Sequence, residues 1–184
     1  MKRLGSTIGA IAALQLTACA ATGDSAPADA GAPSQLQMVV SDLRDASGQI
    51  RARATAEQVG DSIRVRVESI GMTQGAYGAH VHTTGRCDAP AFTTAGPHWN
   101  PTEQQHGKDN PQGMHKGDLP NLLVGTDGRG SFEYAIPNAT IAGRGPNLLL
   151  DQDGAAVVIH AGADDFRTDP SGNSGNRIAC GVLG

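Results

Sequence analysis

The sequence has few aromatic residues and no long apolar run, and both shortages limit the kind of protein it can be. Aromatic residues make up 3% of the chain, but 39% of all residues are hydrophobic, which is enough for a packed core. The mostly apolar run at residues 4–16 is too short to span a bilayer as a stable helix. The chain also lacks an internal repeat, a glycine-rich phosphate loop and a Gly-x-Ser-x-Gly turn.

Positive charge is also limited. The chain carries 14 Lys and Arg against 18 Asp and Glu, which gives a net charge of −4. This balance argues against a nucleic-acid partner. A length of 184 residues suits one domain plus an appendage, and 25 Gly with 10 Pro favour short strands joined by turns.

The N-terminus has the pattern of a targeting segment. Lys2 and Arg3 precede the short apolar run, which ends in Leu-Thr-Ala-Cys at Cys19. This tetrapeptide resembles a bacterial lipobox, so we expect residues 1–18 to be a lipoprotein signal peptide and Cys19 to be lipidated. The alternative is an ordinary secretory signal peptide that is cleaved near Ala18 and leaves Cys19 unmodified. Both predict export, and the first predicts a periplasmic protein held on a bacterial membrane by a lipid anchor.

Residues 19–35 contain the anchor cysteine followed by an Ala/Pro/Ser/Gly-rich tether, and we expect the folded domain to occupy residues 36–184. Within this domain, Ile50, Ala52 and Ala54 alternate with Arg51 and Arg53, a period of two that is typical of strands with one buried face. Similar patterns predict about eight short antiparallel strands, in an all-β sandwich or barrel without helices. The strands are expected at residues 36–43, 49–57, 63–67, around 80–82, at 122–124 and 131–136 as a hairpin, at 148–150 and 155–160 as a pair, and at 177–182.

Histidines are concentrated in one segment. Five of the six lie between residues 80 and 115, Asp118 follows closely, and His160 ends an apolar run further on. A lone histidine is more often a surface or hydrogen-bonded core residue, and a pair such as His80 and His82 is weak evidence. On a strand, however, residues i and i+2 share a face, and imidazole suits copper and zinc. The whole cluster with its carboxylate therefore indicates a metal site.

Four motifs resemble copper/zinc superoxide dismutase: Gly-Ala-His-Val-His at 78–82, Ala-Gly-Pro-His-Trp-Asn-Pro at 95–101, His-Lys-Gly-Asp-Leu at 115–119 and Arg-Ile-Ala-Cys-Gly-Val at 177–182. The resemblance covers residues 36–184 and implies a Greek-key β-barrel or sandwich with long metal-binding and active-site loops. It implies copper at His80, His82, His98 and His160. It implies zinc at His98, His106, His115 and Asp118, with His98 bridging the two ions.

The resemblance also implies an activity. Two superoxide ions and two protons would give oxygen and hydrogen peroxide at a copper ion that cycles between Cu(II) and Cu(I), protecting the cell envelope. His98 would leave copper on reduction, take up a proton, remain on zinc and return the proton to the product.

Further residues receive roles from the same resemblance. Arg177 would guide the superoxide anion to copper, although it could be an ordinary surface arginine. Asp164 would link His80 to His106, although it could be a solvated loop acid and Asp165 lies next to it. Setting Cys19 aside leaves Cys87 and Cys180, which could be buried free thiols; the family pairs these two positions in a disulfide.

Two features differ from better-known relatives. The segment 161–167 has no lysine, so the positive charge that steers superoxide would come from Arg167, Lys108 or Lys116, or steering would be weaker. The interval from Cys87 to His98 is long, as in bacterial members of the family, whose subunit contacts differ from those of eukaryotic members, so a homodimer and a monomer both remain open. A non-catalytic metal-binding module and a structural lipoprotein are the rival functions.

Overall fold

The computed structural model describes residues 37–184. The expected signal peptide, Cys19, the tether and Leu36 lie outside these residues. No helix in the described part of the chain is long and apolar enough to cross a membrane.

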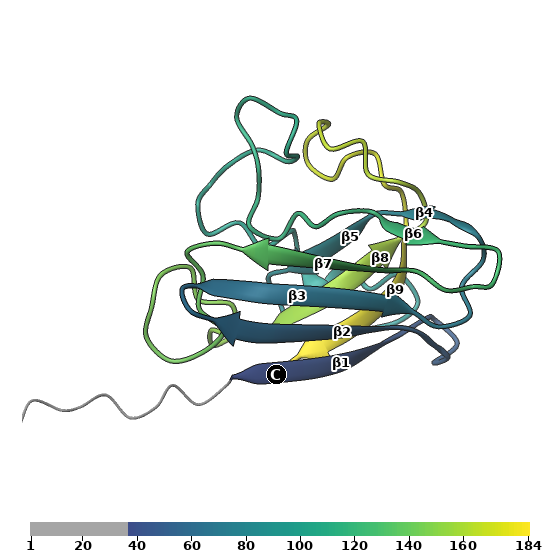
Figure 1. Cartoon of the computed structure of the whole chain (residues 1–184), viewed down its shortest axis with the longest axis horizontal. Coiled ribbons are helices and arrows are strands. Elements are labelled where there is room, and N and C mark those ends of the chain that lie inside the picture. The colour runs from purple at the N-terminus through teal and green to yellow at the C-terminus, as the bar shows by residue number, and fades with distance from the viewer. Residues whose placement is uncertain (1–36) are drawn as a thin grey trace, which may run out of the picture. The chain divides into compact units, whose positions relative to one another are not determined.

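Residues 37–184 form nine strands and one short 3-10 helix (Figure 1). Seven strands make one antiparallel sheet in the order β5-β8-β9-β1-β2-β3-β7, which curls over the core, and the remaining two form a small second sheet, β4-β6. The all-β fold expected from the sequence is confirmed. The elements are β1 (Met38–Arg44), β2 (Ile50–Val59), β3 (Ser62–Ser69), β4 (Gly75–Tyr77), β5 (Ala79–His82), η1 (Thr93–Ala95), β6 (Leu122–Val124), β7 (Ser131–Ile136), β8 (Ala155–His160) and β9 (Arg177–Leu183).

The core follows the predicted alternation. In β2, Ala52 and Ala54 are fully buried, and Arg53 between them is exposed. Ala54 pairs with Val67 of β3, which is also fully buried. Small side chains on β2 opposite branched ones on β3 fill the space inside the curled sheet with few aromatics.

Three expectations about individual elements were wrong. Residues 148–150 are not a strand paired with β8, because the backbone N–H groups of Leu149 and Leu150 donate to carbonyls of the loop at Thr140 and Ile141. Leu149 is nevertheless buried, so its apolar character reflects a loop that covers the core.

The turn expected between residues 122–124 and 131–136 forms, with Gly125 N–H donating to the Arg129 carbonyl. Its strands do not pair with each other, however, because β6 pairs with β4 and β7 pairs with β3. Local alternation could not predict β4, whose three residues obtain their ladder partners from a distant segment. The expectation that the domain has no helix was also wrong, because η1 forms a single 3-10 turn in the loop after β5.

Two long loops are positioned by strands β5 and β8, which are neighbours in the sheet. In Figure 1 the loop after β5 and the yellow loop before β9 rise on the same side of the sheet. They touch each other, since Asp109 N–H donates to the Phe166 carbonyl at 2.9 Å. Three of the six histidines belong to the loop after β5, and the other three lie on β5 and β8.

Candidate metal centre

Strand periodicity places three histidines on one face. In β5, Ala79 and Val81 point into the main core, so His80 and His82 point to the opposite face. His80 pairs with Val158 of β8, and His160 lies two residues further along that same face. The pairing of β5 with β8 therefore brings His160 next to His80 and His82, about eighty positions earlier in the chain.

Hydrogen bonds to the free edge of β5 add two further side chains. Trp99 N–H donates to the Val81 carbonyl, and Val81 N–H donates to the Gly117 carbonyl, each at 2.8 Å. These bonds place His98 opposite His82 and Asp118 opposite His80. A side chain at position 117 would overlap the Val81 carbonyl, which explains the glycine there.

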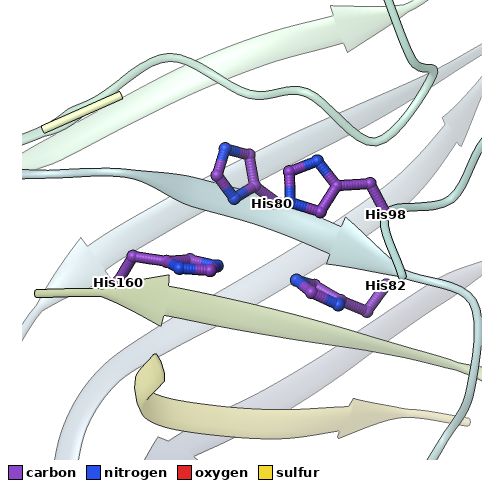
Figure 2. Close-up of side chains that lie close together, drawn as sticks. All are labelled: His80, His82, His98 and His160. Carbon is purple, nitrogen blue, oxygen red and sulfur yellow. The ribbon is translucent and has the colours of Figure 1, made fainter. Parts of the chain in front are cut away.

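We define the first set as His80, His82, His98 and His160. All four are buried, and one nitrogen from each lies within 4.8 Å of the others. Figure 2 shows the rings of His82 and His160 converging with those of His80 and His98 on one space. The His80 and His98 rings stack, with centroids 3.9 Å apart. The structure thus brings together all four residues that were expected to hold copper.

Hydrogen bonds fix the tautomers of three rings in this set. His82 Nδ1 donates to the Gly96 carbonyl at 2.8 Å, and His160 Nδ1 donates to the Gly175 carbonyl at 3.0 Å, since a carbonyl can only accept. His80 Nε2 lies 2.8 Å from Asp164 Oδ2 and donates to it in the same way. The opposite nitrogens, His80 Nδ1, His82 Nε2 and His160 Nε2, keep their lone pairs.

Those three nitrogens have no hydrogen-bond partner, although they are buried. A buried polar atom without a partner costs about 1–3 kcal/mol, so such atoms require an explanation. A metal ion held by their lone pairs provides one. Imidazole nitrogens alone suit copper well, and the first set fits that ion.

Burial also keeps the first set neutral. Desolvation lowers the pKa of His80 to about 3 and that of His160 to about 4. It lowers the pKa values of His82 and His98 as well. Neutral rings at physiological pH can bind a cation without first losing a proton.

We define the second set as His98, His106, His115 and Asp118. The Nδ1 atoms of these histidines lie 2.9, 3.0 and 3.1 Å from Asp118 Oδ1, and the Nδ1 atoms of His98 and His115 lie 3.4 Å apart. Ligands about 2.0–2.1 Å from a tetrahedral ion would be roughly 3.3 Å from one another. Four donors at this spacing fit zinc.

Backbone N–H groups orient the Asp118 carboxylate toward the other three residues of the second set. Gly107 N–H and His115 N–H donate to Oδ2 at 2.8 and 3.0 Å, which leaves Oδ1 facing the three rings. Burial alone would raise the pKa of Asp118, but hydrogen bonds from His106, His115 and His98 outweigh it and hold that pKa far below its usual range. The carboxylate is therefore ionised.

Asp164 connects the two sets. Its Oδ2 accepts from His80 Nε2 at 2.8 Å, and its Oδ1 accepts from His106 Nε2 at 2.9 Å. Although burial opposes it, the hydrogen bonds of His106 to Asp118 and Asp164 raise the pKa of His106 to about 9. Carboxylates that hold the far side of ligand rings orient them toward the ion. The residue with this geometry is Asp164; Asp165 instead bonds within its own loop, to Thr168 and Asn173.

Arg177 lies at the edge of the first set. A bulge in the β8–β9 ladder places it opposite His160. It is half-buried, and its Nη1 and Nη2 donate to the carbonyls of Phe92 and Gly96, both at 2.7 Å. The side chain lines a surface hollow of about 430 Å³, together with Pro90, Ala91, Thr93, Gly175 and Asn176.

A disulfide joins the loop that carries Phe92 to the strand that carries Arg177. Cys87 and Cys180 are bonded, with a Cα–Cα distance of 5.6 Å.

The other cationic residues considered for steering do not line the hollow beside Arg177. Lys108 pairs with Asp109 and lies over the Phe166 ring, and Lys116 donates to the Pro137 carbonyl.

Residue type and spacing did not identify three groups that hold the site in place: the backbone acceptors at Gly96 and Gly175, and the side chain of Asn121.

Comparison with known proteins agrees with this geometry. The family model described as copper/zinc superoxide dismutase (SODC) matches residues 46–183. The chain belongs to the copper/zinc superoxide dismutase family. Superoxide dismutase [Cu-Zn] 1 of Aquifex aeolicus is 37% identical over 143 residues, which cover 77% of this chain and 85% of that protein.

Other relatives differ in what their names state. The superoxide dismutase-like protein YojM of Bacillus subtilis is 41% identical over 124 residues, covering 67% of this chain and 63% of that protein. A crystal structure of a SOD-like protein from Bacillus subtilis superposes with a TM-score of 0.73 at 35% identity, covering 78% of this chain and 97% of that one. The Cu/Zn superoxide dismutase from Brucella abortus, at 23% identity and a TM-score of 0.62, shares the fold.

Proposed function

We propose that this protein is a superoxide dismutase that holds copper in the first set and zinc in the second. The observation that carries the proposal is the group of three unpartnered buried nitrogens in the first set, next to a second set whose donors have tetrahedral spacing. The reaction converts two superoxide ions and two protons into one oxygen molecule and one hydrogen peroxide molecule.

Copper bound in the first set would supply one-electron redox chemistry, which zinc lacks. The protein's own contribution is to hold the rings neutral and oriented. The Gly96 and Gly175 carbonyls and Asp164 each fix the proton of a ring on the nitrogen that faces away from the ion. These three rings therefore need no change of tautomer when the metal binds.

His98 belongs to both sets and has the proton-transfer role. Its Nδ1 lies in the second set, 2.9 Å from Asp118 Oδ1, so its Nε2 is available on the other side of the ring. Burial lowers the pKa of His98, so a proton taken up at Nε2 is readily given to a peroxide product.

Arg177 would attract the substrate. Arg177 lines the hollow together with Gly175, whose carbonyl accepts from His160, and its guanidinium forms no ion pair with a carboxylate among residues 37–184. A permanent charge beside a small opening favours entry of a small anion such as superoxide.

The main rival function is metal binding without catalysis, since one relative is named only as dismutase-like. Both complete donor sets and Arg177 favour the enzyme. The deciding experiment loads the purified protein with copper and zinc and follows superoxide decay. Tight binding of both ions without decay above that caused by free copper would favour the rival.

We also propose that the enzyme works in the periplasm, anchored through lipid on Cys19. The proposal is supported by the Leu-Thr-Ala-Cys sequence after the apolar run. Mass spectrometry of the protein from membranes tests it, with Cys19→Ser as the control. An unlipidated mature N-terminus in the wild type would favour the ordinary signal peptide.

A further inference from the structure

We propose that Asn121 is a positioning residue that sets the orientation of the Asp164 carboxylate and thereby tunes the second set for zinc. This inference rests on the proposed function only in naming zinc as the ion. Asn121 touches neither set of donors directly. It acts through the backbone of Asp164.

The contact is a reciprocal pair of hydrogen bonds. Asn121 Nδ2 donates to the Asp164 carbonyl at 2.9 Å, and Asp164 N–H donates to Asn121 Oδ1 at 2.8 Å. A side-chain amide offers one donor and one acceptor on the same plane, which matches a peptide group. Two bonds fix both the position and the rotation of the Asp164 backbone.

The two partners differ in how firmly they are held. Asn121 directly precedes β6 and lies between Leu119 and Leu122, both buried in the core. Asp164 lies in the loop between β8 and β9, and its neighbours Ala163 and Asp165 are exposed. The core therefore positions the loop through Asn121, and not the reverse.

The Asp164 carboxylate has little tolerance for displacement. Its oxygens accept from His80 Nε2, from His106 Nε2 and from Phe166 N–H. Gly172 packs so closely that a side chain there would overlap Asp164 Oδ1. A rotation of the Asp164 backbone would lengthen the bond to His106 and change the direction of His106 Nδ1.

The test compares zinc affinity, measured by chelator competition, in Asn121→Ala, Asn121→Asp and Asn110→Ala. Asn110 is a matched control, because its amide also reaches a carbonyl of the same loop, that of Arg167, at 3.3 Å. We expect both Asn121 variants to bind zinc about 10- to 100-fold more weakly, as is typical when a group that orients a metal ligand is lost. We expect Asn110→Ala to stay within about twofold of the wild type, since the bonds that it loses, to the Arg167 carbonyl and to Gln105 and Gln112, are all exposed and none reaches Asp164.

A second readout is the electron paramagnetic resonance spectrum of Cu(II) in the first set. It should change in the Asn121 variants, because Asp164 also holds His80. Asn121→Asp keeps the size of the side chain but turns an acceptor toward the Asp164 carbonyl, so it tests the hydrogen bond without opening a cavity.

Zinc affinity in folded Asn121 variants within about twofold of Asn110→Ala would overturn the inference. So would an Asn121→Asp protein that fails to fold even with zinc, since Asn121 would then determine folding and not metal geometry. If wild-type protein binds both ions without consuming superoxide, the proposed function fails, while the zinc comparison still decides this inference.

Discussion

His82 and Arg177 donate to the same acceptor, the carbonyl oxygen of Gly96, at 2.8 and 2.7 Å. One backbone atom therefore fixes the tautomer of a metal-facing ring and the position of the guanidinium beside it. This shared contact links the proposed copper site to the charge that would attract its substrate.

Two substitutions of Arg177 distinguish the effect of its charge from the effect of its hydrogen bonds to Phe92 and Gly96. We expect Arg177→Ala to lower kcat/KM by about 10- to 100-fold at low ionic strength, because the attracting charge is lost. Arg177→Lys should be intermediate, because lysine keeps the charge but lacks the fork that contacts Phe92 and Gly96. Superoxide decay measured against ionic strength checks both, and unchanged rates at equal copper content would show that Arg177 is an ordinary surface residue.

Removing one ligand from each set should separate the two metals. His160 belongs only to the first set, so His160→Ala should lose copper and retain zinc. His115→Ala should do the opposite. Each affinity should fall more than about 100-fold, beyond the effect typical of losing a partner that merely orients a ligand. Metal content after dialysis gives the answer, and parallel loss of both ions in both variants would contradict two separable sites.

Zinc binding should release a proton near neutral pH. The pKa of His106 is raised to about 9, so this ring is protonated in the metal-free protein at pH 7 and must give up its Nδ1 proton to bind an ion. We expect about one proton per zinc at pH 7 and almost none above pH 10. Copper added to protein without zinc should release almost none, since the rings of the first set are neutral and His98 can keep its proton on Nδ1. Calorimetry in buffers of different ionisation enthalpy measures both; equal release by the two ions would contradict the assignment.

Stability of the metal-free protein should peak near pH 6.5. The pKa values of His80 and His160 are lowered to about 3 and about 4, so below pH 6.5 the unfolded chain binds protons that the folded chain does not, and stability falls. The stabilisation that results from the raised pKa of His106 is complete below pH 6.5 and is lost as the pH rises through about 9. Each ring changes stability by up to about 1.4 kcal/mol per pH unit in its window. Urea unfolding at several pH values checks this, and monotonically rising stability from pH 4 to 9 would be inconsistent with it.

The disulfide should contribute to stability. Cys87 and Cys180 are 93 residues apart, and closing such a loop stabilises a fold by about 4–5 kcal/mol in the chain-entropy model. The double variant Cys87→Ser, Cys180→Ser should unfold at correspondingly lower urea concentration. Reduced wild-type protein serves as the control, and a difference below about 1 kcal/mol in both would mean that the bond does little for the fold.

Sequence reasoning predicted a metal site from the clustering of histidines with Asp118, and the division of these residues into a copper set and a zinc set came from the family resemblance. From alternation it predicted that His80 and His82 share a face, to which the pairing of β5 with β8 adds His160. It failed where the partner is a backbone carbonyl, as at Gly96 and Gly175, since every residue has one. It also failed for residues 148–150, which are as apolar as a strand but bond to a neighbouring loop.

The most direct test of the central claim is superoxide decay by the chain from residue 20 onward, loaded with copper and zinc. Metal-free protein and His160→Ala treated in the same way are the controls. We predict rapid decay by the wild type that disappears in both controls. Binding of both ions by the wild type with decay no faster than that of His160→Ala would contradict the account.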